Sequence, residues 1–289
     1  MSKKERSQTA GVRDRKTVAF WSVMAVAIVA ALVMYGISVV REGSPDEAYA
    51  STYVPATTEV VAPVMPKNQI ADVMGRLNDP SHAFQIVVLG DSTGVARRGW
   101  VVQLGEALGA KTGRLVTLNP WSVEQEPDGY IPPWRLANGS QPAVTIWNGS
   151  ASGTKSVYAH SNLNQIVPID GSAVDLVLVN YGHNEETGGL VGYAGPLMAD
   201  MIKRFPNAAI VGVLQNPERP GSAHEQMHDI NIEAFRTYLQ GRNDPMIDVY
   251  TPYKAMPGWE NAFEDKGDLH PSQAGYDLWA SVVRQALGV

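Results

Sequence analysis

The sequence contains no cysteine, and this absence excludes three kinds of chemistry at once. Disulfide bonds, thiolate metal sites and a cysteine nucleophile all require a thiol. An exported fold must then be held together by its apolar core, which is feasible for a domain of roughly 200 residues. The chain has 289 residues, of which 44% are hydrophobic and 18% charged, so it has room for one large domain and additional segments.

Basic charge is scarce outside the N-terminus. Residues 1–16 carry six lysine or arginine side chains and two acidic ones, whereas the whole chain has a net charge of −6, which leaves about −10 for the remainder. Binding to nucleic-acid phosphates requires a basic face. The acidic body therefore argues against a nucleic-acid partner.

One long uncharged run stands out against this composition. Residues 17–40 contain 24 consecutive residues without a charge and without a polar face. As a helix they would extend for about 36 Å, enough to cross a hydrocarbon layer of about 30 Å. Because the basic cluster precedes this run, we expect a transmembrane anchor at 17–40, a cytoplasmic tail at 1–16 and an extracytoplasmic body.

A cleaved signal peptide is the competing interpretation of the N-terminus. Ala48-Tyr49-Ala50 has the form of a cleavage site, but the apolar run is longer than usual and ends ten residues earlier. Under both interpretations, the part of the chain that follows the apolar run is exported. Residues 41–67 are rich in proline, threonine, valine and acidic residues and are expected to form a stalk, which leaves 68–289 as the domain.

The domain shows the alternation of strands and helices that predicts a parallel α/β sheet. The candidate strands are short, continuous and rich in valine and isoleucine, as in strands covered on both faces. They are residues 84–89, 115–118, 143–147, 174–180, 208–214 and 246–250. The candidate helices are residues 96–109, 192–205, 224–240 and 272–287.

Ligands of parallel sheets bind beyond the carboxyl ends of the strands, so the residues that follow the strands are the candidates for chemistry. Ser92 follows the first strand on a turn between Gly90 and Gly94, where its hydroxyl is exposed or simply caps a helix. Asn184 and Gly149 follow two other strands, where they are able to donate hydrogen bonds to an oxyanion or only make turns. His270 precedes the last helix, with Asp268 nearby to fix its tautomer.

Taken in order, these segments resemble the four sequence blocks of the SGNH (GDSL-like) hydrolase superfamily. The blocks are Gly90-Asp91-Ser92, Gly149 within WNGSASGT, Gly182-His183-Asn184, and His270-Pro271 before the last helix. The resemblance covers about residues 80–289. It implies a flavodoxin-like three-layer α/β/α sandwich with a parallel sheet, and hydrolysis of carboxylic esters without a metal or cofactor.

The resemblance also implies a role for each site residue. Ser92 would attack the ester carbonyl, with His270 as its base and Asp268 as the group that orients the histidine. The backbone N–H groups of Ser92 and Gly149 and the side chain of Asn184 would hold the oxyanion.

The sequence departs from the family pattern at three positions. Gly267 stands three residues before His270, where the family usually has aspartate, so Asp268 is the first choice of orienting group and Asp265 the second, with a backbone carbonyl as a third possibility. Glu185 stands where aspartate is usual. The spacing of the glycine block is ambiguous, and Gly153 is the alternative to Gly149.

Other classes of protein fit parts of the sequence. Residues 90–94 also match the nucleophile elbow of α/β-hydrolases, but that fold places several strands before its serine. His224-Glu225-Gln226-Met227-His228 matches the H-E-x-x-H zinc motif, which would leave the serine-hydrolase blocks unexplained. An O-acyltransferase would share the serine and histidine, and an inactive binding domain would share the scaffold.

The predicted substrate is a carbohydrate ester of the cell envelope or the extracellular space. O-acetyl groups are the first choice, and lipid or short acyl esters the second. Five aromatic residues near the site-bearing segments are candidates for stacking on sugar rings or for the core. They are Trp121, Tyr130, Trp134, Trp147 and Tyr158.

Overall fold

The computed structural model describes residues 67–264 and 269–289. The expected cytoplasmic tail, transmembrane anchor and stalk, up to residue 66, lie outside the described residues, and so do Asp265 and Asp268. Within the described ranges, no helix combines the length and the apolar character needed to span a membrane.

The described residues form an α/β domain whose elements alternate along the chain. The helices are α2 (Ile70–Leu77), α3 (Trp100–Thr112), α4 (Ser156–Ser161), α5 (Leu163–Ile166), α6 (Gly189–Arg204), α7 (Glu225–Arg242), α8 (Tyr250–Ala255) and α9 (Gln273–Leu287). The strands are β1 (Phe84–Gly90), β2 (Arg114–Ser122), β3 (Gly129–Tyr130), β4 (Trp134–Ala137), β5 (Ser140–Asn148), β6 (Leu176–Asn180), β7 (Ala209–Leu214) and β8 (Met246–Asp248).

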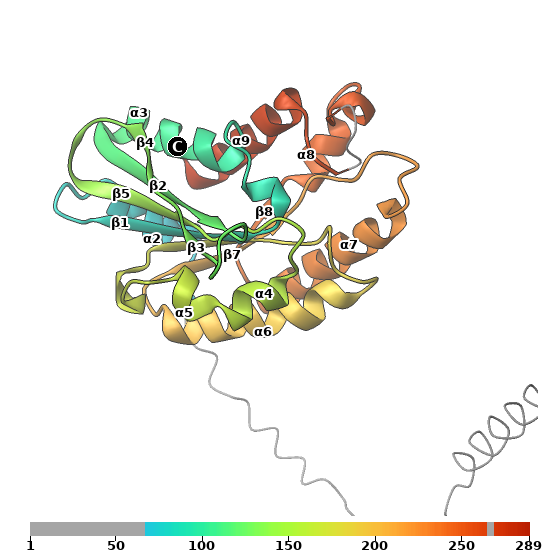
Figure 1. The fold of residues 1–289 in the computed structure, drawn as a ribbon, viewed down its shortest axis with the longest axis horizontal. Helices are drawn as coiled ribbons and strands as arrows, with labels where there is room; N and C mark the ends of the chain where they lie inside the picture. Colours follow the sequence, from blue (N-terminus) through green and yellow to red (C-terminus); the bar gives the residue numbers. More distant parts are fainter. Residues whose placement is uncertain (1–66, 265–268) are drawn as a thin grey trace, which may run out of the picture. The chain divides into compact units, whose positions relative to one another are not determined.

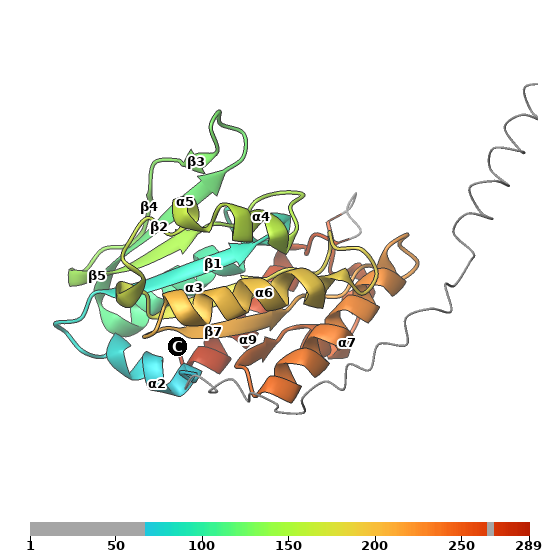
Figure 2. The same cartoon turned by 90° about the horizontal axis from the view of Figure 1, so that it is seen from below.

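The strands build one sheet in the order β3-β2-β5-β1-β6-β7-β8, with β4 also paired to β2. Pairs among β2, β5, β1, β6, β7 and β8 are parallel, whereas β3 and β4 run antiparallel to β2. From β5 to β8 the order is the flavodoxin-like 2-1-3-4-5. The strand β2 extends this five-stranded order by one strand at its β5 edge. In Figure 2, β3 lies near the end of the hairpin that follows β2 and projects from the sheet.

Helices cover both faces of the sheet. In Figure 1, α3 and α9 lie on one side of the strands, and α4, α5 and α6 lie on the other. Alternate residues of β1 enter two separate cores, because successive side chains of a strand point to opposite faces. Phe84, Ile86 and Val88 pack with α2, α3 and α9, and Val87 and Leu89 pack with α4 to α7. This explains why the strands read as continuous apolar runs.

All six predicted strands and all four predicted helices are present, but their boundaries differ. The helix predicted from residue 96 begins at Trp100, because the chain first makes a turn in which the Gly99 N–H donates to the Ala96 carbonyl at 2.9 Å. The short elements α2, α4, α5, α8, β3 and β4 were not predicted. Their few residues carry too little periodic pattern to be recognised.

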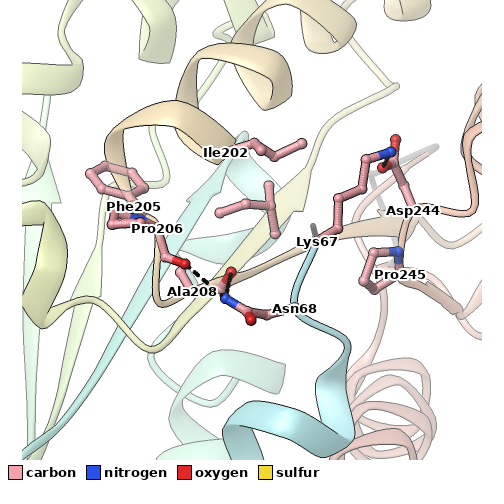
Figure 3. Close-up of a pocket in the computed structure, with 9 residues that line it drawn as sticks. Lys67, Asn68, Ile202, Phe205, Pro206, Ala208, Asp244 and Pro245 are labelled. Carbon is pink, nitrogen blue, oxygen red and sulfur yellow. Dashed lines mark hydrogen bonds and ion pairs between the residues drawn. The ribbon is translucent and has the colours of Figure 1, made fainter. Parts of the chain in front are cut away.

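The first described residues, Lys67 and Asn68, contact the chain just before β7 and β8 (Figure 3). The Asn68 side chain donates to the carbonyl of Ala208, which precedes β7, and Lys67 forms an ion pair with Asp244. The pocket between these residues has a volume of only about 10 Å³, enough for about one water molecule. It lies at the end of the strands opposite to Ser92, and we assign no ligand to it.

Candidate active site

Ser92 is placed by the end of the central strand β1. Asp91 follows this strand and accepts a hydrogen bond from the Thr93 N–H at 2.9 Å, which caps a short 3-10 helix at Ser92–Gly94. The Asp91 side chain is buried, whereas Ser92 is half-buried. The turn therefore presents the serine hydroxyl at the carboxyl end of the sheet, where ligands of such sheets bind.

The structure brings His270 to Ser92 across 178 positions of sequence. Nε2 of His270 lies 2.9 Å from Oγ of Ser92, a hydrogen-bond distance. The serine donates this bond when the imidazole carries its proton on Nδ1, and this tautomer accepts the serine proton during attack. Both residues are half-buried, so the pair is accessible to a substrate.

Two helices that follow these residues bring them together. α3 follows the Ser92 turn and α9 follows His270, and the two pack on the same face of the sheet (Figure 1). The indole rings of Trp100 and Trp279 stack with centroids 5.5 Å apart and an interplanar angle of 3°. The Gln103 side chain donates to Asp277 at 2.9 Å. The packing of α3 on α9 therefore determines the distance between Ser92 and His270.

The segment that carries His270 is held from two sides. The His270 carbonyl accepts a hydrogen bond from the Glu264 N–H at 2.9 Å. The Asn216 side chain, just beyond β7, donates to the Leu269 carbonyl at 2.9 Å. Nothing in the local sequence around Asn216 indicated this contact, because it depends on where the C-terminal segment returns to the sheet.

A buried polar network lies beneath the Ser92 turn. The Gln215 side chain donates to Asp91 at 3.0 Å, and its oxygen accepts from the His183 N–H at 3.1 Å. The Asn180 side chain donates to the Thr93 hydroxyl at 3.0 Å. These hydrogen bonds join the ends of β1, β6 and β7, although the Asn180 side-chain oxygen has no partner among the described residues. We did not predict Gln215 or Asn180, although both lie at strand ends.

The glycine block lies beside the Ser92 turn, but the Gly149 amide is already engaged. Its N–H donates to the Val88 carbonyl at 2.8 Å, as part of the pairing of β5 with β1. An oxyanion would have to break this bond, so the structure argues against Gly149 as a donor. The alternative, Gly153, lies in a turn with a φ of +71°. Asn148 links the two loops, because its side chain donates to the Gly94 carbonyl at 2.9 Å.

Asn184 follows β6 and lies against the same glycine block. Its side-chain nitrogen donates to the Thr154 carbonyl at 3.1 Å, and the residue is half-buried. One of its two N–H donors is thus occupied and fixes the orientation of the amide. The neighbouring Glu185 accepts from the Ser156 N–H at 2.8 Å, and its burial raises its pKa. Glutamate at this position joins the Asn184 loop to the start of α4.

The H-E-x-x-H segment serves the fold. The His228 side chain is buried and its Nε2 lies 2.9 Å from the Asn216 carbonyl, while Glu225 accepts from the Gly221 N–H at 2.7 Å. The His228 ring stacks on His183 with centroids 4.0 Å apart. Within residues 67–264 and 269–289, no group of three or more ligating side chains is arranged to hold a metal ion.

Four of the five aromatic candidates contact one another. Tyr130 meets Trp121 and Trp147 edge to face, with centroids 5.0 and 5.3 Å apart, and the Trp121 N–H donates to the Tyr158 hydroxyl at 2.9 Å. Trp134 makes no ring contact with these four, but together with Trp121 it lines a cleft beside the glycine block. Most of this aromatic set therefore packs within the domain.

Chemically, the arrangement resembles other activated serines. A hydroxyl that is hydrogen-bonded to an imidazole loses its proton as it attacks a carbonyl carbon. The site lies at the carboxyl ends of the strands, where neighbouring loops supply side-chain amides and backbone N–H groups. These are the groups that stabilise an oxyanion.

Comparisons with known proteins agree with this fold. Residues 88–278 match the model of the GDSL-like Lipase/Acylhydrolase family. A search of curated proteins found no match. The chain is similar in fold to a lipase/acylhydrolase from Enterococcus faecalis, with 19% identity, a TM-score of 0.51 and coverage of 71% of this chain and 96% of that one. It is also similar to the acetyl xylan esterase AlAXEase, with 13% identity, a TM-score of 0.51 and coverage of 70% and 99%.

Because the family model covers more than half of the chain, the protein belongs to the GDSL-like lipase/acylhydrolase family. The predicted superfamily is confirmed, and the protein is a hydrolase of ester bonds. The α/β-hydrolase alternative is wrong, because β1 is the strand that leads directly to Ser92 and no strand precedes it in the described part of the domain.

Proposed function

We propose that the protein is a serine esterase in which Ser92 is the nucleophile and His270 is its general base. The observation that carries this proposal is the 2.9 Å contact between Nε2 of His270 and Oγ of Ser92. Ser92 attacks the ester carbonyl while His270 takes the hydroxyl proton. His270 then returns that proton to the departing alcohol, and a water molecule releases the acyl group by the reverse sequence.

The oxyanion formed during attack requires donors close to Ser92. We propose the Ser92 N–H and the Asn184 side chain, with the Gly153 N–H in place of the Gly149 N–H, which is bonded to Val88. For the orientation of His270 we retain Asp268, with Asp265 second. Their side chains lie outside the described residues, so this assignment depends on their position in sequence.

We propose O-acetyl or short acyl esters of carbohydrate as the substrates. A cleft of about 330 Å³ begins beside the Ser92 turn, and this is near the lower end of the volumes of small-molecule sites. Its lining includes Ser122, Glu124, Asn148, Ser150 and Ser152 together with aromatic and aliphatic side chains. Asn148 and Ser122 have partners within the domain, but the Ser150 hydroxyl has none in the part of the chain that the structure describes. A long acyl chain would leave such a group without a partner, whereas sugar hydroxyls would pair with it.

We further propose that the esterase domain is exported and attached to the membrane through residues 17–40. The support is the uncharged run and the basic residues before it. The predicted stalk at residues 41–67 would then separate the domain from the membrane surface. Accessibility of the domain to protease in intact cells would test this arrangement.

The esterase mechanism is tested by hydrolysis of 4-nitrophenyl acetate. Wild-type protein should release 4-nitrophenol, and Ser92→Ala should lose at least about 10³-fold in kcat. Ser172→Ala is the matched control, because Ser172 also lies in a 3-10 turn capped by an aspartate but is exposed. Comparable turnover by Ser92→Ala would remove Ser92 from the mechanism. Of Asp268→Ala and Asp265→Ala, measured alongside, only one should show a large loss.

A further inference from the structure

The cleft beside Ser92 contains an arginine whose position the proposed reaction does not explain. Arg97 lies five residues after Ser92 and lines the cleft together with Val95 and Ser150, which flank the nucleophile turn. Its guanidinium carbon lies 4.4 Å from the ring centroid of Trp134, the aromatic residue at the start of β4. The stacking fixes a flexible side chain against one wall of the cleft.

The charge of Arg97 is left available for a ligand. The side chain is exposed, and within residues 67–264 and 269–289 it makes no ion pair and no side-chain hydrogen bond. Glu124 is the only acidic residue among those that line the cleft, and the two do not approach within 4 Å. A guanidinium is planar, and its N–H donors match the two oxygens of a carboxylate.

The wall that carries Trp134 comes from the addition at the edge of the sheet. β3 and β4 pair antiparallel to β2, which is the outermost of the parallel strands. Pro120 and Trp121 at the end of β2, and Ile131 just after β3, also line the cleft. Arg97 lies between the 3-10 helix at Ser92–Gly94 and α3, so it approaches the cleft from the Ser92 side. The guanidinium therefore lies over Trp134 on one wall of a cleft whose lining also includes Val95 and Ser150, which adjoin the nucleophile turn.

We infer that this cleft binds the alcohol portion of an acidic saccharide ester, and that Arg97 pairs with the carboxylate of a uronic acid unit. The inference rests on the proposed esterase function and deepens it by naming the substrate class. The mixed polar and aromatic lining receives the sugar, and Arg97 is the one cationic side chain among the described residues that line the cleft. Trp134 acts as a positioning residue that holds the guanidinium.

The experiment compares two acetylated substrates that differ in charge. The wild-type protein is assayed with acetylated tri-galacturonic acid and with acetylated xylotriose, and kcat/KM should be higher for the acidic substrate. Arg97→Gln should lower the ratio of the two values about tenfold or more, because a charge-assisted bidentate contact is lost. Arg98→Gln is the matched control, since the next arginine is also exposed but does not line the cleft, and it should leave the ratio unchanged.

Binding gives a second measurement that does not depend on turnover. Unacetylated tri-galacturonic acid should bind to the Ser92→Ala protein more tightly than xylotriose does, and the difference should shrink with Arg97→Gln and with added salt. Equal binding of both trisaccharides, or an unchanged ratio in Arg97→Gln, overturns the inference while the esterase proposal stands. Absence of hydrolysis of every ester overturns the esterase proposal, and the binding result then decides the inference alone.

Discussion

At the scale of single residues, the site consists of a few side chains whose neighbours fix their orientation. Ser92 lies in a turn capped by Asp91, and Asn184 has one amide hydrogen bonded to the Thr154 carbonyl. A donor that is already oriented needs little reorganisation when negative charge develops, and this is why such donors are effective. Gly149 shows the opposite case, since its amide is fixed within the sheet.

Replacement of Asn184 by alanine should therefore lower kcat by about 10²–10³, with a smaller change in KM, because the lost donor acts on the transition state. Steady-state kinetics with 4-nitrophenyl acetate measure the effect. Asn164→Ala, which changes an exposed asparagine on α5, should leave kcat unaltered. A variant of Asn184 with wild-type kcat would exclude this side chain from the oxyanion site.

At the scale of elements, the segment between β7 and α7 connects the two halves of the site. Gln215 contacts Asp91 under the serine, and Asn216 contacts the Leu269 carbonyl next to the histidine. Consecutive residues of one loop thus support both reacting groups. The segment also carries Glu218, which lies 3.5 Å from the buried His183.

Asn216→Ala should lower kcat more than it changes KM, because it frees the Leu269 carbonyl and lets His270 move away from Ser92. A double-mutant cycle separates this effect from general damage. If Asn216 acts through His270, the substitution should lower activity at least tenfold in the wild-type background and have little further effect when His270 is already alanine. Equal losses in both backgrounds would show that Asn216 does not act through the histidine.

At the scale of the whole molecule, two apolar cores and a buried polar cluster hold the domain together without disulfides. Burial lowers the pKa of His228 well below 6.5, and the neighbouring His183 and Lys254 act in the same direction. At Glu218, burial raises the pKa of the carboxyl. Its contacts with His183 and Ser222 lower that pKa by more, so the net shift is downward. Both groups bind protons more readily in the unfolded chain than in the folded one.

Stability should consequently fall as the solution becomes more acidic. His228 contributes a loss as the pH falls through about 6.5, where the unfolded histidine gains a proton, and Glu218 adds a loss as the pH falls through about 4.5 and below. Calorimetry should show a lower Tm at pH 5.5 than at pH 7.5. His228→Asn should have a lower Tm at pH 7.5 but a smaller decrease between the two values. An identical decrease in both proteins would contradict the assignment to His228.

Much of the fold was predictable from local pattern. The six strands were recognised because a strand buried on both faces is continuously apolar, and the order of the blocks around Ser92, Asn184 and His270 indicated the family. The roles of Gln215, Asn216 and Arg97 were not predictable, because each depends on a segment that is distant in the chain. The ambiguity between Gly149 and Gly153 also needed the structure, since sequence spacing does not reveal which amide is bonded within the sheet.

The parallel α/β class and the residue types available for ester chemistry follow from local sequence patterns, because apolar periodicity and strand-end motifs are local properties. The contact between His270 and Ser92 depends on the folded molecule, because the distance between them is set by the packing of α3 on α9 through Trp100 and Trp279. The same holds for the cleft, whose wall exists because β2, β3 and β4 fold beside the glycine block. Contacts between distant segments follow from how complete elements pack, and no short stretch of sequence contains that information.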